Sequence, residues 1–231
     1  RQAGRYLEEY RQIRATQTDF ISFCLNPEKA STVTLQPITR FGFDAAIIFS
    51  DILMVPWALQ RNVRFKPNVG PLLDPMQSPK AIKQSLIDDL SQKLAPVGEA
   101  LRLTKSNMPA ETALIGFAGA PWTIMTYMAE GGSSRIFAIT REWAWKYPKQ
   151  MDALLSSLIE STISFLSLQA SSGADALMLF DSWASAVPAA QRDWLVTQPA
   201  RLVIEGLRKS GHKQPVIGFP KGIGEGLINY V

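Results

Sequence analysis

Four short runs of consecutive apolar residues constrain the fold of this chain most strongly. They are residues 45–49, 113–117, 176–180 and 215–219, and small or polar residues follow each of them. None of the runs alternates polar with apolar positions, and continuous apolar character is typical of parallel strands covered on both faces. The runs therefore predict an α/β protein with a parallel sheet and right-handed helical crossovers between its strands.

Helical patterns fill the segments between the runs. Asn26-Pro27 and Ser78-Pro79 each predict a helix start, because an N-cap residue precedes proline at the first helical position. Apolar residues recur at helical spacing further along, and Gly173 and Gly211 follow two of these patterns as stop signals. The predicted helices cover residues 80–107 (with an interruption near Pro96), 149–172 and 189–210.

This repeat of strand, loop and helix fits either an open sheet or part of a (β/α)8 barrel. The 231 residues contain no linker-like or low-complexity segment, so we expect a single domain over residues 1–231. A complete barrel needs eight strands in about 250 residues, and four are recognisable here. The chain begins at Arg1 without a methionine and stops at Val231 soon after a glycine-rich loop, so we expect a piece of a longer protein.

The charge balance gives little support for a nucleic-acid or membrane protein. Lysine and arginine number 24 against 20 aspartate and glutamate residues, a net charge of +4 with no dense basic run. We find no apolar run that approaches the roughly 20 residues of a membrane span. We therefore expect neither nucleic acid nor a membrane as a partner, and the small positive excess fits anionic small ligands.

One cysteine and one histidine cannot together form a zinc site. Cys24 lies in an apolar helical stretch, so we expect a buried structural thiol in a reducing, cytoplasmic compartment. His212 lies in a polar turn after a glycine, which predicts a position at the surface.

Ligands of parallel α/β proteins gather at the carboxyl ends of the strands. That rule selects Asp51, the loop of residues 119–122, Asp181-Ser182 and Lys221. Asp51 lies between two apolar segments, so its carboxylate is expected to be poorly hydrated and to need a cationic or N–H partner. An ion pair with an arginine is the alternative explanation of this residue.

Two further polar side chains belong to the same strand ends. Tyr127 lies about two turns into a helix predicted to start at Pro121, where it either faces a ligand or packs in the core. Ser182 has no histidine placed to act as its base, so we expect it to form hydrogen bonds and not to act as a nucleophile. Residues 222–226 hint only weakly at a phosphate loop, because Glu225 would repel an anion.

The first residues of the chain place two arginines around a glycine. Arg1 and Arg5 carry planar guanidinium groups, and Gly4 lets the backbone approach a ligand closely. We interpret this segment as a clamp for carboxylates.

Taken together, these motifs resemble the uroporphyrinogen decarboxylase family. Arg1-Gln2-Ala3-Gly4-Arg5-Tyr6-Leu7 is similar to the amino-terminal signature of that family. The resemblance continues in order through residues 45–53, 116–128, 180–184 and 218–222, and so extends over the whole chain.

The resemblance implies a (β/α)8 barrel of the TIM type, of which this chain holds about the first half. An amino-terminal substrate-binding segment at residues 1–25 would precede strand–helix units over residues 43–231. The implied activity is removal of the four acetate carboxyl groups of uroporphyrinogen, which gives coproporphyrinogen in haem biosynthesis. The family acts as a homodimer and needs neither cofactor nor metal.

The candidate residues suit that chemistry. Each acetate is attached to an electron-rich pyrrole, and protonation of a ring carbon gives a cation that accepts the electrons released with carbon dioxide. The enzyme must therefore bind carboxylates and stabilise positive charge on the macrocycle. Arg1 and Arg5 suit the first task, and Asp51 suits the second because its oxygens accept pyrrole N–H groups. The implied substrate-binding positions are Arg1, Gln2, Ala3, Gly4, Arg5, Arg14, Asp51, Tyr127 and Ser182.

Several alternatives stay open at this point. The proton donor is an arginine-held water, Arg1 itself or Asp51. The histidine with which family members contact their substrate has no counterpart here, and His212 lies in a different context. A cobalamin-dependent methyltransferase of the same superfamily, which would need zinc ligands, and an inactive porphyrin-binding fragment are the competing functions.

Overall fold

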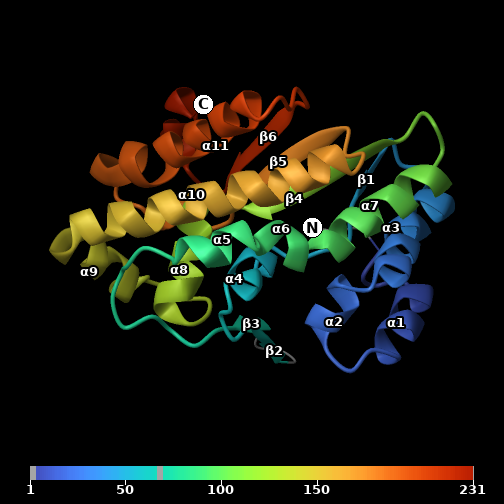
Figure 1. Cartoon of the computed structure of the whole chain (residues 1–231), viewed down its shortest axis with the longest axis horizontal. Helices are drawn as coiled ribbons and strands as arrows, with labels where there is room; N and C mark the ends of the chain where they lie inside the picture. Colours follow the sequence, from blue (N-terminus) through green and yellow to red (C-terminus); the bar gives the residue numbers. More distant parts are fainter. Residues whose placement is uncertain (1–3, 67–69, 231) are drawn as a thin grey trace.

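The computed structural model describes residues 4–66 and 70–230 (Figure 1). At its centre lies a parallel sheet of four strands in the order β1-β4-β5-β6. These strands are β1 (Ala45–Ile47), β4 (Ala113–Gly119), β5 (Ala176–Asp181) and β6 (Val216–Pro220). The predicted α/β class and the four parallel strands are confirmed, and the arrangement corresponds to part of a (β/α)8 barrel.

One face of the sheet packs against helices, and the other is more open. Leu177 and Leu179 of β5 lie on the helix-covered face and are fully buried, whereas Ile217 and Phe219 of β6 are 41% and 44% exposed. The prediction of strands covered on both faces is therefore wrong for β6, whereas the end of β4 is buried on both faces. The physical reason is that β1 and β6 are the edges of this sheet, each with a strand on one side only.

The predicted helix at residues 149–172 is confirmed as α10 (Pro148–Ser171), which runs across the sheet beside α11 (Gln198–Lys209) (Figure 1). It ends before Gly173, whose φ of 103° is a left-handed conformation that favours glycine. Among the described residues, α10 alone is long and apolar enough to cross a membrane by length and composition, with a mean hydropathy of 1.3. The core helix of a globular protein meets the same criterion, and α10 packs against β4, α8 (Pro121–Glu130) and α11.

Gln169 joins α10 to the middle of the sheet. Its side chain is fully buried, its Oε1 accepts from the Phe117 N–H at 2.8 Å and its Nε2 donates to the Phe117 carbonyl at 2.8 Å. The pairing of β1 with β4 ends at Ile47 opposite Ile115, so Phe117 lies beyond it. The amide of Gln169 therefore satisfies two backbone groups that would otherwise be buried without a partner.

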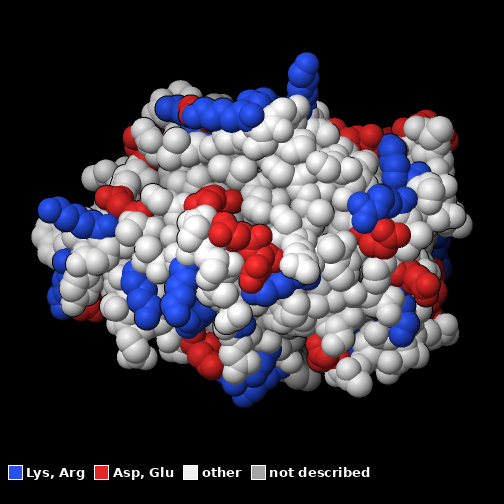
Figure 2. All heavy atoms as spheres, in the orientation of Figure 1, with Lys and Arg blue, Asp and Glu red and all other residues white. Residues whose placement is uncertain are grey.

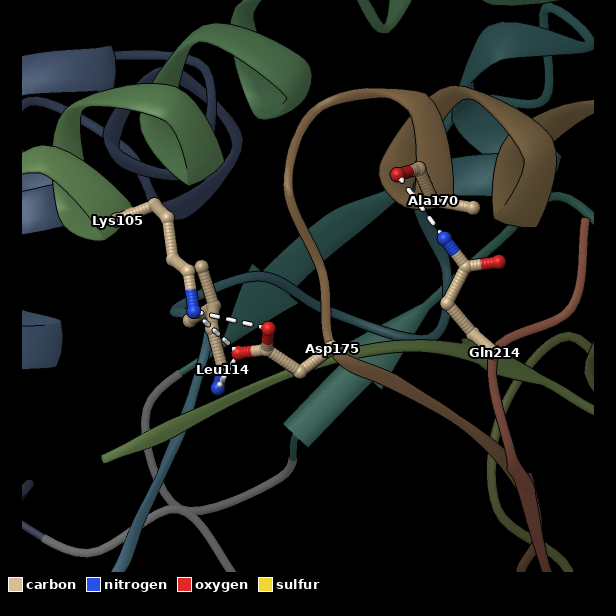
Figure 3. Close-up of polar contacts among 5 residues, drawn as sticks. All are labelled: Lys105, Leu114, Ala170, Asp175 and Gln214. Atoms are coloured by element: carbon tan, nitrogen blue, oxygen red, sulfur yellow. Dashed lines mark hydrogen bonds and ion pairs between the residues drawn. The ribbon is translucent and has the colours of Figure 1, made fainter. Parts of the chain in front are cut away.

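Asp175 connects three segments at the amino ends of the strands (Figure 3). Its carboxylate accepts hydrogen bonds from Lys105 Nζ at 2.8 and 2.6 Å and from the Leu114 N–H at 2.7 Å. Burial acts to raise the pKa of Asp175, but the hydrogen bonds from Lys105 and Leu114 outweigh it and lower the pKa below its ordinary value. Nearby, Gln214 Nε2 donates to the Ala170 carbonyl at 3.4 Å and ties the end of α10 to the segment before β6.

The helix start predicted at Asn26-Pro27 is confirmed, and the one at Ser78-Pro79 is wrong. Asn26 Oδ1 accepts from the Lys29 N–H at 3.0 Å and caps α3 (Pro27–Phe41). Residues 78–83 are not helical, because the Ile82 N–H donates to Ser157 Oγ of α10 at 3.1 Å instead of forming a helical bond. Helical structure resumes in α5 (Gln84–Asp88), α6 (Leu90–Lys93) and α7 (Ala95–Asn107), and the break near Pro96 is confirmed at the start of α7.

The helix predicted over residues 189–210 is less regular than expected. A 3-10 turn (Ala189–Gln191) and a π-helical turn (Asp193–Thr197) precede α11. The sequence patterns also missed a short antiparallel hairpin, β2 (Arg64–Lys66) with β3 (Gly70–Leu72). The remaining elements are α1 (Glu8–Ala15), α2 (Phe20–Cys24), α4 (Met54–Ala58), α9 (Ala138–Lys146), and 3-10 turns at Ala184–Ala186 and Gly224–Asn229.

Figure 2 shows the face of the molecule that α10 crosses. Positive and negative side chains are interspersed on this face, including acidic side chains near its middle, with uncharged areas between them. This face therefore has no concentrated basic surface of the kind that nucleic-acid binding requires.

We expect Gln169→Met to lower the free energy of unfolding by about 2–5 kcal/mol, because the two polar groups of Phe117 would each lose a buried partner. Chemical denaturation monitored by circular dichroism measures this change. The exposed Gln12, on α1, supplies the matched control, and Gln12→Met should stay within about 0.5 kcal/mol of the wild type. Equal stabilities of the two variants would contradict the structural role of Gln169.

Candidate active site

The predicted site residues lie along the edge of the sheet formed by the carboxyl ends of its strands. Asp51 follows β1, Ser182 follows β5, and the strand between them, β4, leads directly into α8, which carries Tyr127. Arg1, Gln2 and Ala3 lie outside the described residues, so the amino-terminal part of the clamp stays a prediction.

Asp51 is half-buried, and a backbone hydrogen bond holds its carboxylate. The Leu53 N–H donates to Asp51 Oδ1 at 2.9 Å, in the turn that leads from β1 into α4. Burial raises the pKa of Asp51, while this hydrogen bond and the positive charge of Arg5 oppose the rise. Among residues 4–66 and 70–230, the ion pairs of the structure do not include Asp51, so the alternative of a structural arginine pair is not realised there.

Arg5 lies over two aromatic rings beside Asp51. Its guanidinium carbon is 5.1 Å from the ring centroid of Phe20 and 5.4 Å from that of Phe49, two residues before Asp51. Such cation–π contacts orient a guanidinium while leaving its N–H groups available to a ligand. Arg5 is exposed, so its charge is accessible from solvent.

Gly4 gives the backbone before Arg5 its direction. Its φ is 97°, its carbonyl accepts from the Leu7 N–H at 2.8 Å, and a Cβ at this position would lie 3.4 Å from the ring of Pro37. A left-handed residue against a packed proline favours glycine strongly. In the structure, the Gly4 backbone therefore approaches α3 closely, and its predicted approach to a ligand stays a prediction.

Arg14 contacts the same aromatic ring as Arg5. Its guanidinium carbon is 5.9 Å from the Phe20 centroid, and its Nη1 donates to the Gln17 carbonyl at 3.2 Å. Arg14 also lines a cavity of about 630 Å³ between α2 and the β2–β3 hairpin, together with Arg64. Arg5 and Arg14, the two described arginines among the predicted substrate-binding residues, thus both contact Phe20.

Tyr127 is buried within α8, with 7% of its surface exposed. Its ring centroid is 6.3 Å from that of Trp183. Burial raises the pKa of Tyr127, the side chain of Trp183 opposes the rise, and the negative charge of Asp51 adds to it. Tyr127 therefore lies between the strand end that carries Asp51 and the loop that follows β5, and it packs in the core as well.

Ser182 and Asp181 follow one another at the end of β5 but differ in their surroundings. Ser182 is half-buried, and its hydroxyl makes no hydrogen bond to another described residue. Asp181 is 1% exposed, and its Oδ1 accepts from Thr123 Oγ1 at 2.6 Å. Burial raises the pKa of Asp181 to about 7 against this hydrogen bond. The sequence marked Asp181 as a strand-end residue but gave no indication of its burial.

A profile of the family described as uroporphyrinogen decarboxylase (URO-D) matches residues 1–231. The chain belongs to the uroporphyrinogen decarboxylase family. The predicted family resemblance is thereby confirmed.

The proteins that are similar to this chain in sequence include uroporphyrinogen decarboxylases of bacteria. The one from Caulobacter vibrioides (strain NA1000 / CB15N) is 49% identical over 230 residues, which covers 100% of this chain and 65% of the relative. The one from Maricaulis maris is 46% identical over 224 residues, which covers 97% of this chain and 65% of the relative. The chain thus spans about 65% of the length of these family members.

A solved structure supports the fold. A methyltransferase from Methanosarcina mazei superimposes with a TM-score of 0.71 at 14% sequence identity, over 90% of this chain and 60% of that one. At this identity the likeness concerns the fold alone.

The other polar residues selected from the sequence lie apart from Asp51 or have structural roles. Cys24 is fully buried, as predicted, and burial raises its pKa well above the ordinary value. His212 is partly exposed and precedes β6, at the sheet edge opposite the candidate site. The loop of residues 222–226 leads into a 3-10 turn. Within the described part of the chain, no cluster of three or more His, Cys, Asp or Glu side chains could hold a metal ion.

The raised pKa of Asp181 predicts a specific dependence of stability on pH. Because the folded chain holds this proton more tightly than the unfolded chain, the free energy of unfolding should fall as the pH rises from about 4 to about 7 and level off above that. A shift from 3.8 to about 7 corresponds to a loss on the order of 4 kcal/mol. Asp181→Asn removes the titration, so its stability curve should be flatter over this window.

Denaturant titrations at several pH values measure the difference. Asp88→Asn, at an exposed position on α5, is the control and should keep the wild-type slope. Parallel curves for the wild type and Asp181→Asn would show that Asp181 does not titrate in this range.

Proposed function

We propose that this protein decarboxylates the four acetate side chains of uroporphyrinogen to give coproporphyrinogen. The single observation that carries the proposal beyond family membership is the arrangement of opposite charges at the strand ends. Asp51 provides a half-buried carboxylate, and Arg5 provides an accessible guanidinium close enough to act on the pKa of Asp51. A ligand with anionic side chains around a cationic, N–H-bearing ring is complementary to both.

The proposed chemistry needs two separate functions from the chain. Arg5 binds peripheral carboxylates of the macrocycle, and the other amino-terminal candidates are proposed to extend this contact: Arg1, Gln2, Ala3, Gly4 and Arg14. Asp51 accepts the pyrrole N–H groups that point to the centre of the macrocycle. Tyr127 and Ser182 are proposed to contact the substrate from the ends of β4 and β5.

The reaction step is proposed as follows. A proton adds to the pyrrole α-carbon next to the carbon that bears the acetate. The resulting cation accepts the electron pair of the breaking carbon–carboxyl bond, which forms an exocyclic double bond to the ring as carbon dioxide leaves. The exocyclic carbon then takes up a proton to become a methyl group, and the ring carbon loses the proton that it gained. Asp51 stabilises the cation, because a carboxylate in a poorly hydrated position interacts more strongly with positive charge than one in water does. The proton donor is a water held by arginine, Arg1 or Asp51. The scheme uses no metal and no cofactor.

We expect Asp51→Asn to lower kcat by about 100- to 1000-fold while the protein remains folded, because the side chain keeps its size but loses its charge. Conversion of uroporphyrinogen by the complete gene product, followed by chromatography of the oxidised porphyrins, measures the effect. Asp44→Asn is the matched control, since Asp44 is exposed at the opposite end of the same strand.

Three results would argue against the proposal in different ways. Near-normal turnover by Asp51→Asn would remove Asp51 from the mechanism. Binding of uroporphyrinogen without turnover by the wild-type protein would favour a porphyrin-binding function. Stoichiometric zinc in the purified protein would favour a methyltransferase.

We propose in addition that the protein works as a homodimer in the cytoplasm. Support comes from the family resemblance, and Cys24 is fully buried and free, as suits a reducing compartment. Trp145 of α9 and the preceding Ile136 are 83% and 66% exposed, and apolar side chains this accessible are common at subunit contacts.

Sedimentation of the complete gene product is expected to give twice the monomer mass. Trp145→Glu should shift that mass toward the monomer, whereas Lys146→Glu on the same helix should leave it unchanged. A monomer at all accessible concentrations would contradict the dimer.

A further inference from the structure

We infer that Asp181 is a positioning residue of the candidate site: through Thr123 and Trp183 it fixes the loop that carries Ser182 and the side chain that packs on Tyr127. Asp181 itself does not contact the substrate. The inference deepens the proposed decarboxylation and rests on it.

The alternation of side chains along β5 directs Asp181 away from the proposed ligand. Leu177, Leu179 and Asp181 form the buried series of the strand, with 0%, 0% and 1% exposure. Leu177 is opposite Gly116 of β4, where a Cβ would lie 2.7 Å from Gln169 of α10. Asp181 therefore faces the helix layer, and Ser182, the next residue, leaves the strand on the less buried side.

The hydroxyl of Thr123 transmits the effect of Asp181 to the loop. Thr123 Oγ1 donates to Asp181 Oδ1 at 2.6 Å and accepts from the Trp183 N–H at 3.2 Å. A hydroxyl has a single hydrogen to donate. Because Asp181 takes that hydrogen, the lone pairs of the oxygen are left to face Trp183. Asp181 thus sets the orientation in which Thr123 can hold the backbone just after Ser182.

A second residue of α8 holds the other backbone group of Trp183. Trp122 Nε1 donates to the Trp183 carbonyl at 3.0 Å. The indole of Trp183 in turn lies against Phe137, at 5.1 Å between centroids, and its ring centroid is 6.3 Å from that of Tyr127. The first two turns of α8 and the loop after β5 therefore form one unit that includes both Tyr127 and Ser182.

Within the described part of the chain, Asp181 has no ion-pair partner that would explain its burial as a structural salt bridge. The ion pairs recorded for residues 4–66 and 70–230 do not include it. Lys221, after β6, contributes its backbone N–H to the Asp181 carbonyl at 3.0 Å. On the other side, burial raises the pKa of the Tyr230 phenol, and the nearby charge of Asp181 adds to the rise. The Asp181 carboxyl is thus held by the Thr123 hydroxyl, as a positioning group would be.

The test compares Thr123→Val with Thr123→Ser in the complete gene product. Valine keeps the volume of threonine and loses the hydroxyl, whereas serine keeps the hydroxyl. We expect Thr123→Val to lower kcat by about 10- to 100-fold with a smaller change in KM, and Thr123→Ser to restore most of the activity. Thr126→Val is the matched control, because the buried Thr126 hydroxyl bonds only to the Thr123 carbonyl within α8. This control should retain wild-type kcat.

A second measurement does not depend on turnover. Hydrogen exchange of the Trp183 amide, followed by nuclear magnetic resonance, should be faster in Thr123→Val than in wild type and unchanged in Thr123→Ser and Thr126→Val. If the wild-type protein shows no decarboxylation, the proposed function fails, and the exchange result still decides whether Asp181 and Thr123 hold the loop.

A second pair of variants covers the case in which Thr123→Val does not fold. Asp181→Asn keeps an oxygen that can accept from Thr123 and should preserve the slow exchange of the Trp183 amide, whereas Asp181→Leu should accelerate it. Wild-type exchange and wild-type kcat in Thr123→Val, or in Asp181→Leu, would overturn the inference.

Discussion

The two hydrogen bonds between Gln169 and Phe117 are the contact on which the rest of the structure depends. They connect the longest helix to the central pair of strands at a point where β1 no longer supplies a partner to β4. Beyond that point β4 continues to Gly119 and turns directly into α8. The position of α8, and of the site residues that it carries, therefore follows from a side-chain amide that completes the sheet from the helix layer.

Two strand ends differ in which of their polar residues is buried. After β1, the buried Ser50 precedes the half-buried Asp51, and at the end of β5 the buried Asp181 precedes the half-buried Ser182. The alternation of side chains along β5 directs Asp181 toward the helices and the next residue toward the candidate site. A carboxylate thus serves as a site residue on one strand and as an internal support on the other.

The sequence predicted the parts of the fold that have strong local patterns. The four apolar runs became the four parallel strands, and the long apolar repeat became α10, because burial and helical spacing agree in these segments. The short β2–β3 hairpin escaped detection because three-residue strands, one of which contains Pro71, have too little pattern to recognise. The helix start predicted at Ser78-Pro79 is wrong, because a tertiary hydrogen bond from the Ile82 N–H to Ser157 competes with the helix that the local sequence favours.

The sequence selects candidate site residues, but it does not predict the contacts among them. Asp51, Tyr127 and Ser182 could be selected because strand ends and family motifs identify them. The aromatic support of Arg5 and Arg14 by Phe20 could not be foreseen, because residues of one type serve equally in cores and in sites. The role of Asp181 depends on which way a strand faces, and only the packed sheet determines that.

The alternation of side chains at the end of β5 also limits how this sequence can vary in length. Loops such as the one after α10 can gain or lose residues at little cost, since their ends move independently of the sheet. A single residue inserted within β5 would exchange the directions of Asp181 and Ser182, leaving a carboxylate toward the ligand and a hydroxyl against the helices. Insertions and deletions in relatives should accordingly accumulate outside these strands, even where the amino acids within them change.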